Sequence, residues 1–400
     1  MTSMLSGWEK RHLRDVVHIK HGFAFKGEHI GTNGPYVLMT PGNFFEEGGF
    51  KRNGDKQKRY SGAVPREYIL PSESLVVAMT EQAEGLLGSA AFIPDDEVYL
   101  HNQRIGLVTS ESTDIRFLYY LLNTRAVRQQ IRASSSGTKV RHTSPSRIGE
   151  VTAWLPPLAI QSRIANVLSA YDDLIEVSQR RIAILEDMAR RLFDEWFVRF
   201  RYPGRDEVGF IDELPTGWAK VPLSEIAKFK RGKQQLTKKA YTEKGFVAFS
   251  ASGPDGFLES WEVDEKAVVV SGVGAYCGKT WLARDKWTCI ANTFYLLPIG
   301  QNITAEFLYL ITLGVHFWPR RGAAQPFIST GDAGAIQVTL PPQSILIKFN
   351  QAVVPILDQI AVLERTNTSL RAARDLLLPK LVSGQIGVSA TEETFAQAAE

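Results

Sequence analysis

The stretch Leu155-Pro156-Pro157-Leu158-Ala159-Ile160, with the residues after it up to Phe200, decides the fold of this chain. After the two prolines the sequence runs to Phe200 without another proline or any glycine. Apolar side chains recur in alternating steps of four and three, a heptad pattern that predicts one long helix. At a rise of ~1.5 Å per residue the helix would be roughly 60 Å long, and a helix of that length needs a partner. The heptad positions are Ile164, Leu168, Tyr171, Ile175, Ile182, Leu185, Leu192 and Trp196, with Ser178 and Ala189 at the two remaining places.

The partner helix is a second copy of the same pattern. Adding 185 to each number carries Leu155-Pro156-Pro157 onto Leu340-Pro341-Pro342 without loss of phase. Two matching stripes bury each other most simply as an antiparallel pair. Pro355 should kink the second helix, and Pro379 and Gly384 should end it. The second set of heptad positions is Phe349, Val353, Ile356, Ile360, Leu363, Asn367, Leu370, Arg374, Leu377 and Leu381.

The segments before the two helices also repeat. Gly7-Trp8 returns as Gly217-Trp218 at an offset of 210, and Phe117-Leu118-Tyr119 returns as Phe307-Leu308-Tyr309 at an offset of 190. One unit is therefore present twice, and the first copy carries twenty additional residues between Gly22 and Gly88. An internal repeat of this size predicts two related domains.

Each repeat is predicted to be a mixed α/β domain, mostly strands with a helix late in the unit. Strands are expected at 36–39 and 75–79 in the first copy and at 246–249 and 267–270 in the second, and helices at 115–131 and 305–317. The fold class is therefore α+β, with two similar domains separated by two long antiparallel helices that form a coiled-coil-like spacer. The predicted boundaries are 1–154 for the first domain, 155–205 for the central helix and linker, 206–339 for the second domain, 340–386 for the C-terminal helix and 387–400 for a tail.

Composition excludes several classes of protein. The 400 residues are 44% hydrophobic, which suits domains with cores of their own. No run reaches the ~18 uncharged apolar residues of a membrane span, and the first twenty residues are too polar for a signal peptide, so we expect a cytoplasmic protein. Cys277 and Cys289 are the only cysteines and are expected to be reduced, packed thiols.

The net charge of +3 decides nothing, but its distribution is uneven. No acidic residue lies between Asp114 and Glu150 or between Glu225 and Glu243. Such windows suit a polyanion, and their alternative is a solvated surface. The basic residues in them are Arg116, Arg125, Arg128, Arg132, Lys139, Arg141 and Arg147, then Lys228, Lys230, Arg231, Lys233, Lys238 and Lys239.

Three patterns mimic catalytic or ligand sites. The stretch 271–280 resembles a phosphate-binding loop, but Val273 stands where that motif needs glycine, which favours a plain glycine-rich turn. Asp255, Asp264 and Lys266 mimic the acid and lysine pattern of a metal-dependent nuclease, although nothing corresponds to them in the first copy. The histidines His18, His21, His101 and His142 lack a metal-ligand spacing, so no metal and no catalytic residue is predicted.

The repeated landmarks together resemble the specificity (S) subunit of Type I restriction-modification enzymes. They are the two Gly-Trp openings, the two Leu-Pro-Pro entries, Gln161-Ser162-Arg163-Ile164, Asp173 and Asp358 at matching points of the helices, and the ending Leu377 to Ile386. The resemblance covers nearly the whole chain. The second copy departs from the pattern, because Leu346 stands where Gln161 does and Pro355 where Ala170 does.

The resemblance implies that the chain is a non-catalytic, sequence-specific DNA-binding subunit. Each domain would be a target recognition domain that reads one half of a bipartite site in double-stranded DNA, while the helices set the spacing. Base contacts would come from loops that carry Arg, Lys, Asn or Gln, and phosphate contacts from the basic windows. The candidate DNA-binding residues are Lys51, Arg52, Lys56, Lys58, Arg59, Arg141, Lys228, Lys230, Arg231, Lys233, Lys238, Lys239, Arg320 and Arg321.

The resemblance also implies partners on the long helices. Apolar residues beyond the heptad positions, Ile184 among them, would dock two methyltransferase (modification) subunits, or else pack against the chain's own domains. The candidate partner-binding residues are Met188, Phe193, Trp196, Phe197 and Phe200. The chain would bind no cofactor directly, since S-adenosylmethionine, and ATP with Mg²⁺ where restriction or translocase subunits join, belong to the partners. The alternative from another class is a stand-alone Mg²⁺-dependent nuclease that uses Asp255, Asp264 and Lys266.

Overall fold

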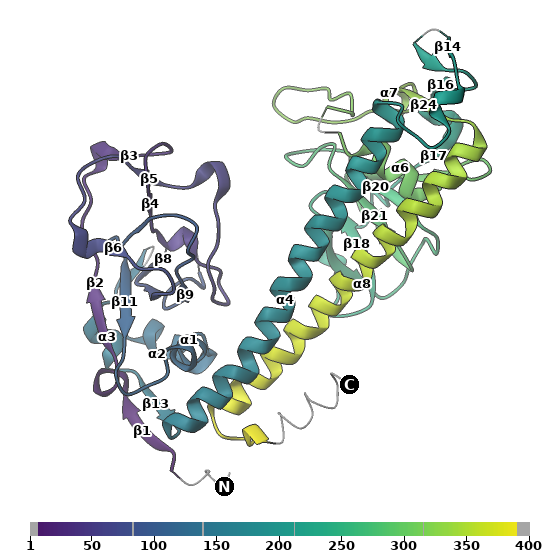
Figure 1. Ribbon diagram of the computed structural model, residues 1–400. Helices are drawn as coiled ribbons and strands as arrows, with labels where there is room; N and C mark the ends of the chain where they lie inside the picture. Colours follow the sequence, from purple (N-terminus) through teal and green to yellow (C-terminus); the bar gives the residue numbers. More distant parts are fainter. Residues whose placement is uncertain (1–6, 82–83, 138–139, 212, 315, 390–400) are drawn as a thin grey trace. The chain divides into compact units, whose positions relative to one another are not determined.

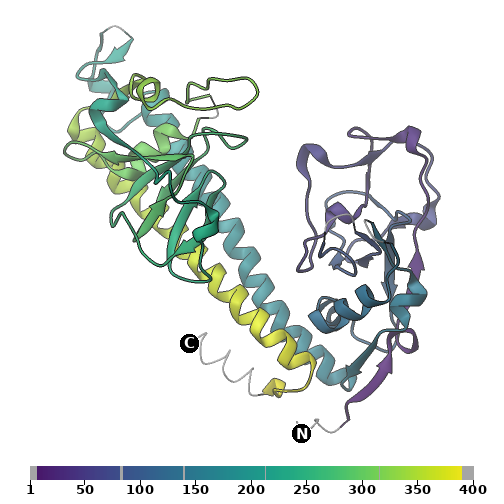
Figure 2. The same cartoon turned by 180° about the vertical axis from the view of Figure 1, so that it is seen from behind.

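The computed structural model describes residues 7–81, 84–137, 140–211, 213–314 and 316–389. The chain forms two compact units, and each combines one globular domain with one part of each long helix. Unit 1 comprises residues 1–177 and 367–400, and unit 2 comprises residues 178–366. Figures 1 and 2 show the two units from opposite sides.

Both long helices form. Helix α4 spans Leu158–Phe193 and α8 spans Gln343–Val382. In unit 1 the first half of α4 lies beside the end of α8, and in unit 2 the second half of α4 lies beside the start of α8, so the two helices run antiparallel as predicted (Figure 1). The heptad positions lie on the inward faces: Ile164, Leu168 and Ala189 on α4 are almost fully buried, as are Phe349 and Val353 on α8, whereas others such as Tyr171 and Leu370 are partly buried.

Proline affects α8 less than predicted. The helix continues through Pro355, whose side chain is exposed, so the carbonyl left without a donor can bond to water. Pro379 does not end the helix either: it leaves the carbonyl of Asp375 without its donor, and Asp375 is exposed, so that carbonyl can bond to water. The helix ends at Val382, just before Gly384, which has a φ of 71°.

α8 is also the one helix among the described residues that is long and apolar enough, by length and composition, to cross a membrane. Of its most apolar 18-residue window, 39% is buried inside the protein. Phe349 and Val353 belong to the core of unit 2, and Leu381 to the core of unit 1. Packing within the protein therefore uses part of the apolar surface of α8.

The globular part of unit 1 contains two main sheets. Strands β2, β11, β7 and β9 form an antiparallel sheet, and strands β3, β5, β4, β10 and β6 form a second one in which β4 and β10 are parallel. Strand β1 pairs with β13 directly before α4. The elements are β1 Glu9–His12, β2 His18–His21, β3 Ile30–Gly31, β4 Tyr36–Leu38, β5 Arg59–Tyr60, β6 Ile69–Leu70, β7 Leu75–Ala78, β8 Thr80–Glu81, β9 Ala90–Phe92, β10 Tyr99–Leu100, β11 Ile105–Thr109, α1 Ile115–Leu122, α2 Arg125–Ala133, β12 Arg141–His142, α3 Pro145–Gly149 and β13 Thr152–Leu155.

Unit 2 repeats this topology. Strands β17, β23, β20 and β21 form the antiparallel sheet, β19, β18 and β22 form the second sheet with β18 and β22 parallel, and β16 pairs with β24 directly before α8. Strand β5 pairs with β4 as β19 pairs with β18. Where unit 1 has the short strands β3 and β6, unit 2 has the single antiparallel bridges Thr242–Phe257 and Val263–Trp287. The elements are β14 Phe210–Ile211, β15 Leu214–Pro215, β16 Ala219–Pro222, α5 Leu223–Ile226, β17 Ala227–Arg231, β18 Phe246–Ser250, β19 Gly253–Leu258, β20 Ala267–Ser271, β21 Thr280–Ala283, β22 Trp287–Cys289, β23 Thr293–Pro298, α6 Ala305–Thr312, α7 Thr330–Gly334 and β24 Gln337–Leu340.

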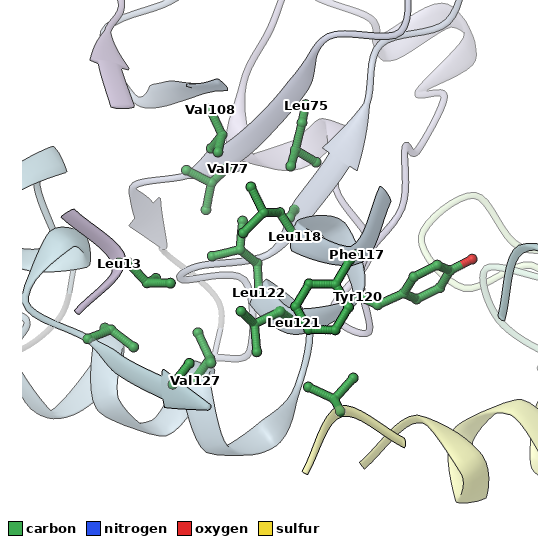
Figure 3. Packing of buried hydrophobic residues seen from close by; sticks show 14 of the residues in the cluster. Leu13, Leu75, Val77, Val108, Phe117, Leu118, Tyr120, Leu121, Leu122 and Val127 are labelled. Carbon is green, nitrogen blue, oxygen red and sulfur yellow. The ribbon is translucent and has the colours of Figure 1, made fainter. Parts of the chain in front are cut away.

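An interior strand of each main sheet is buried on both faces, which explains its continuous apolar sequence. In β7, Leu75 and Val77 face the cluster around α1, whereas Val76 and Ala78 face the cluster of the second sheet. Figure 3 shows the first side, with side chains of α1 gathered against Leu75, Val77 and Val108. Strand β20 alternates in the same way between two clusters.

The helices late in each domain are shorter than predicted. The predicted helix 115–131 is two helices, because Asn123 and Thr124 interrupt it and the Thr124 hydroxyl accepts the Val127 N–H as the cap of α2. The predicted helix 305–317 is α6 alone, which ends at Thr312. A polar cap divides the first helix, whereas the second ends with Leu313 as its C-cap, directly before Gly314.

The Gly-Trp and Leu-Pro-Pro landmarks meet in space. A Cβ atom placed on Gly7 would lie 3.1 Å from the Pro157 ring, and one on Gly217 would lie 3.4 Å from the Pro342 ring. Trp8 then packs on the core of unit 1 and Trp218 inside that of unit 2. The paired landmarks therefore join the start of each domain to the start of a long helix.

Candidate nucleic-acid interface

Five candidate residues of the first domain lie on and beside one loop. Lys51, Lys56 and Lys58 are exposed, and none of them has an ion-pair partner among the described residues. Arg52 is paired with Asp96, and the Arg59 guanidinium lies 2.5 Å from the Glu97 carboxylate. The three lysines therefore keep their charge available, whereas the two arginines are neutralised within the domain.

In the second domain, Lys228, Lys230 and Arg231 lie on β17, which is an edge strand of the main sheet. All three side chains are exposed. They come at the same place as His18, Lys20 and His21 on β2 of the first domain. Equivalent edges of the two domains thus present different charges.

Most of the other second-domain candidates have acidic partners. Lys233 lies 3.8 Å from Glu262, Lys238 lies 2.5 Å from Asp255, and the Arg321 Nη2 atom donates to Asp332 over 2.7 Å. Lys239 is exposed, and Arg320 is exposed beside the Gly274–Gly278 turn. In the first domain, Arg141 donates to the Ser135 hydroxyl. Which of these residues contact DNA stays a prediction.

Exposed aromatic side chains next to lysines were not singled out from the sequence. The Lys286 ammonium lies 4.0 Å from the ring centre of Trp261, which is 43% exposed. Lys279 lies between Tyr276 and Trp281, at 5.8 and 5.6 Å from their ring centres. Such pairs can stack on bases or hold a phosphate. Only the folded chain brings Lys286 to Trp261, so no local sequence signal would have revealed that pair.

Comparison with known proteins places these features in a family. Residues 5–187 and 215–370 match the family described as "Type I restriction modification DNA specificity domain". The chain belongs to this family.

Individual relatives and a solved structure agree. The chain is 27% identical over 311 residues to the Type I restriction enzyme MjaIX specificity subunit of Methanocaldococcus jannaschii, which covers 70% of this chain and 71% of the relative. It is 24% identical over 247 residues to the EcoBI specificity subunit of Escherichia coli, which covers 58% of this chain and 49% of the relative. Its fold is similar to the crystal structure of the S subunit from M. genitalium, with a TM-score of 0.63, 19% identity, and coverage of 96% and 97%.

This S subunit therefore has two target recognition domains, sets the DNA target specificity of a Type I restriction-modification complex, and is itself non-catalytic. The family binds no cofactor itself. The residues of the nuclease alternative are engaged elsewhere. Asp255 accepts from Lys238, Tyr241 and Ser250, Asp264 lies 3.8 Å from Lys286, and Lys266 donates to Glu306 and Asp358. The described residues contain no group of three potential metal ligands.

The other sequence patterns have structural roles in the S subunit. The stretch that resembles a phosphate-binding loop is a turn whose Gly274 N–H donates to the Pro326 carbonyl. Both cysteines are free and buried, as expected, and burial raises the pKa of the Cys289 thiol to about 12. His101 is fully buried in the S subunit, and burial lowers the pKa of its imidazole to about 4.

Four of the five candidate partner-binding residues of the S subunit take part in the packing of unit 2. Trp196 and Phe197 are buried against Phe349, with ring centres 5.6 and 4.7 Å from it. Phe193 stacks on Phe197, and Phe200 packs on Trp218. Met188 is 48% exposed, and Leu174, Val177 and Ile184 on the same helix are also exposed.

Proposed function

We propose that each recognition domain reads one half of a bipartite, asymmetric DNA target, and that α4 and α8 set the separation of the two halves. One observation carries this proposal: the same strand order is built twice with different exposed side chains. The edge strand β2 presents His18 and His21 where β17 presents Lys228 and Arg231. Two readers with one fold and different surfaces suit two different half-sites.

The helices suit a spacer. Two rigidly joined readers meet the same face of a duplex when the half-sites lie about one helical turn apart, ~34–36 Å. Helix α4 has 36 residues and is therefore about 54 Å long at 1.5 Å per residue. A helix of that length is long enough for that separation.

Among the candidate DNA contacts, the exposed residues without an acidic partner support the proposal best. Within the described part of the chain they are Lys51, Lys56 and Lys58 in the first domain and Lys228, Lys230, Arg231 and Lys239 in the second. Flexible lysines on loops and strand edges suit phosphate contacts, which fix the position of a protein on DNA without reading bases. Base contacts then fall to other loop residues of each domain.

We further infer that two methyltransferase subunits dock on the long helices and bring S-adenosylmethionine, and that restriction or translocase subunits, with ATP and Mg²⁺, join where the complex restricts. Exposed apolar residues on α4, Met188 and Ile184 among them, support a docking surface there. In this proposal, residues 1–154 and 206–339 recognise DNA, and residues 155–205 and 340–386 set the spacing. The complex acts in the cytoplasm.

The test is co-expression of the tagged chain with its neighbouring methyltransferase subunit, followed by mapping of methylated bases in genomic DNA. We expect a complex with two methyltransferase subunits and modification at one split motif with two different halves. Exchange of residues 206–339 for those of another S subunit should change one half only. Modification at a continuous motif, or a change in both halves, would refute the bipartite reading.

A further inference from the structure

Each recognition domain carries an antiparallel backbone pair, called a hairpin below, at the same place. In the first domain, Ser136 and His142 exchange backbone hydrogen bonds of 3.0 and 2.8 Å, and in the second Arg321 and Phe327 exchange bonds of 2.9 and 2.8 Å. The two pairs differ by 185 in number. Each hairpin is followed by a short helix, α3 or α7. The hairpins are therefore equivalent parts of the duplicated unit.

Glycine and backbone docking confirm that equivalence. Gly137 and Gly322 both have positive φ, at 93° and 80°. A Cβ atom on either would collide with a carbonyl oxygen three residues later, that of Val140 or of Gln325. Both turns thus need glycine. The residue after each hairpin then docks on the end of a sheet strand, since Thr143 N–H donates to Met79 and Ile328 N–H donates to Gly272, each over 2.9 Å.

The charges at these two places differ. We call Ser135, Ser136, Arg141 and Arg147 the first hairpin site. The Arg147 Nη1 atom donates to the Ser136 hydroxyl over 2.8 Å, and the Arg141 Nη1 atom donates to the Ser135 hydroxyl over 3.2 Å. Neither arginine has a carboxylate partner among the described residues. Two guanidinium groups are therefore held in place by neutral groups, and their charge is not compensated.

The nearest acid across the strand pair does not neutralise them. Glu81 lies opposite Arg141 in the pairing of β8 with β12. Its side chain is almost fully buried and its Oε2 atom accepts the N–H groups of Gly85 and Leu87, at 3.1 and 2.9 Å. The carboxylate thus stabilises the turn behind the strand.

In each domain one side-chain pair joins the hairpin to the short helix after it. In the first domain the pair is an arginine and a serine, and in the second it is an arginine and an aspartate. Arg321 stands at the place of Ser136, and Asp332 stands at the place of Arg147. The Arg321 Nη2 atom donates to Asp332 Oδ1, and its Nε atom lies near Oδ2, both at 2.7 Å. This two-point ion pair neutralises Arg321. We call Arg320, Arg321 and Asp332 the second hairpin site.

We propose that Arg141 and Arg147 of the first hairpin site each hold a DNA phosphate, and that Arg321 of the second hairpin site does not. This rests on the proposed function, since it assigns one contact of a DNA-reading domain. A guanidinium has five N–H donors in a rigid fork, so one bond to a serine leaves donors for a phosphate oxygen. The serine bond orients the arginine in advance, whereas the Asp332 carboxylate takes the donors and the charge of Arg321.

The test measures DNA binding by the full chain, with the subunits that co-purify with it, as a function of salt. The probe is a duplex that contains the mapped methylation motif, and a second duplex has the first half-site scrambled. Each phosphate contact contributes about 0.9 to the slope of log affinity against log salt. Arg147→Gln keeps a donor for Ser136 and removes the charge. We expect the slope to fall by about 0.9 and the affinity to fall about eightfold at 0.1 M salt, equally on both duplexes.

Matched variants separate a phosphate contact from a structural role. Arg147→Lys keeps the charge and should keep the slope near the wild-type value. The double variant Arg321→Gln/Asp332→Asn removes one ion pair at the equivalent place of the second domain without change of net charge, and should leave the slope unaltered. Asp332→Asn alone releases the charge of Arg321 and should raise the slope. Circular dichroism and thermal melting check that each variant folds.

The possible failures are distinguishable. If wild-type binding does not depend on salt, or if no binding occurs, the proposed DNA-reading function itself fails. If the wild type binds with a steep slope that Arg147→Gln and Arg141→Gln leave unchanged, only the assignment of the first hairpin site fails. A loss confined to the intact motif, with unchanged slope, would make these arginines base readers and overturn the phosphate assignment.

Discussion

The two recognition domains are joined to their long helices by equivalent buried apolar residues, which we call the apolar frame, and by different hydrogen bonds and ion pairs. In unit 1 the buried amide of Gln161 on α4 accepts the N–H of Asp114, which caps α1, and donates to the Pro156 carbonyl, at 2.9 and 2.8 Å. The Ser162 hydroxyl donates to the same Asp114. The Gln-Ser motif at the start of α4 therefore ties that helix to the cap of α1.

In unit 2 the corresponding bond is made one turn further along the helix. Leu346 stands at the place of Gln161 and is buried among apolar side chains. Thr304 caps α6 and donates to Asn350, and Asn350 donates to the Asn302 carbonyl, at 3.1 and 2.8 Å. Asn350 lies at the place of Ala165 in the repeat. The cap is tied in both units, but the residue that ties it has moved.

The ion pairs at the helices differ in the same way. Asp172 on α4 accepts from Tyr120 of α1 and from Arg374 of α8. In unit 2, Asp358 on α8 is paired with Lys266 and Arg284, and Lys266 also donates to the buried Glu306. A buried apolar side chain fills a space of fixed volume, so its position in the sequence is the same in both repeats. A hydrogen bond or ion pair needs only one donor and one acceptor within reach, so the residues that form it can differ between the repeats. The following predictions test that difference.

The largest effect is expected at the apolar frame. Phe349→Ala in unit 2 removes a fully buried ring in contact with Phe193, Trp196 and Phe197, and should lower the free energy of unfolding by about 3–5 kcal/mol. Its counterpart at the same heptad position of unit 1 is Ile164→Ala, for which we expect about 2–5 kcal/mol. Urea unfolding followed by tryptophan fluorescence and circular dichroism measures both. An effect below about 1 kcal/mol for either would contradict the shared frame.

The exchanged polar bond gives the next effect. Gln161→Leu installs the second-domain residue in unit 1 and leaves the N–H of Asp114 and the Pro156 carbonyl without their partner, which should cost about 1–3 kcal/mol. The reciprocal Leu346→Gln buries an amide in an apolar site and should cost a similar amount. The midpoints of urea unfolding measure both changes in stability. If Gln161→Leu left the free energy of unfolding unchanged, the two junctions would be interchangeable.

The ion pairs should differ in strength because they differ in exposure. Asp172→Asn acts on side chains that are 30% and 23% exposed and should cost about 1–2 kcal/mol, since Arg374 loses a partner. Asp358 is 47% exposed, so Asp358→Asn should cost about 0.5–1 kcal/mol. Thermal melting at low and high salt compares them. The opposite order would mean that the network with Lys266 and Glu306 is the stronger junction.

A smaller effect is expected from pH. Burial alone would raise the pKa of Asp358, but hydrogen bonds from Lys266 and Arg284 hold it below its ordinary value of 3.8. A depressed pKa contributes stability above that ordinary value, and the contribution is lost as pH falls through the lowered one. Stability should therefore fall between about pH 5 and pH 3 more steeply in the wild type than in Asp358→Asn, as melting temperatures would show. Parallel curves would contradict the assignment.

The smallest effect is expected at the residue that the nuclease alternative needs. Asp264 is 59% exposed and its ion pair with Lys286 is long, at 3.8 Å, so Asp264→Ala should change stability by about 0.5 kcal/mol or less. Methylation by the assembled complex should be unchanged. Restriction digests of genomic DNA isolated from the variant strain measure this, and loss of modification would reopen the role of that carboxylate.

Much of the fold can be predicted from the sequence because its apolar periodicity and its landmark motifs each occur in two copies. The heptad positions in 164–196 and 349–381 predict the buried face of α4 and α8, and the repeat of Gly-Trp and Leu-Pro-Pro predicts two similar domains. Local polar groups limited the prediction. Thr124 divides a helix that apolar periodicity would continue, and Pro379 is tolerated because Asp375, whose carbonyl loses its donor, is exposed.

The candidate DNA-binding residues were predicted less completely. A basic window reveals that charges gather, but not which of them are neutralised. Asp96 reaches Arg52 across 44 positions and Asp332 reaches Arg321 across 11. The first hairpin site was visible as an acid-free window, whereas its difference from the second site depends on which side chains face one another.

The sequence by itself determined the duplication, the helical spacer and the family, because periodicity and repeated landmarks are properties of a linear pattern. Only the tertiary structure decided that Trp196 and Phe197 serve the core of unit 2, that Gln161 and Asn350 tie equivalent caps, and that Arg147 is uncompensated while Arg321 is not. Burial and charge compensation arise between residues far apart in the chain. They exist only once folding has brought a donor and an acceptor, or two apolar faces, within a few ångströms of each other.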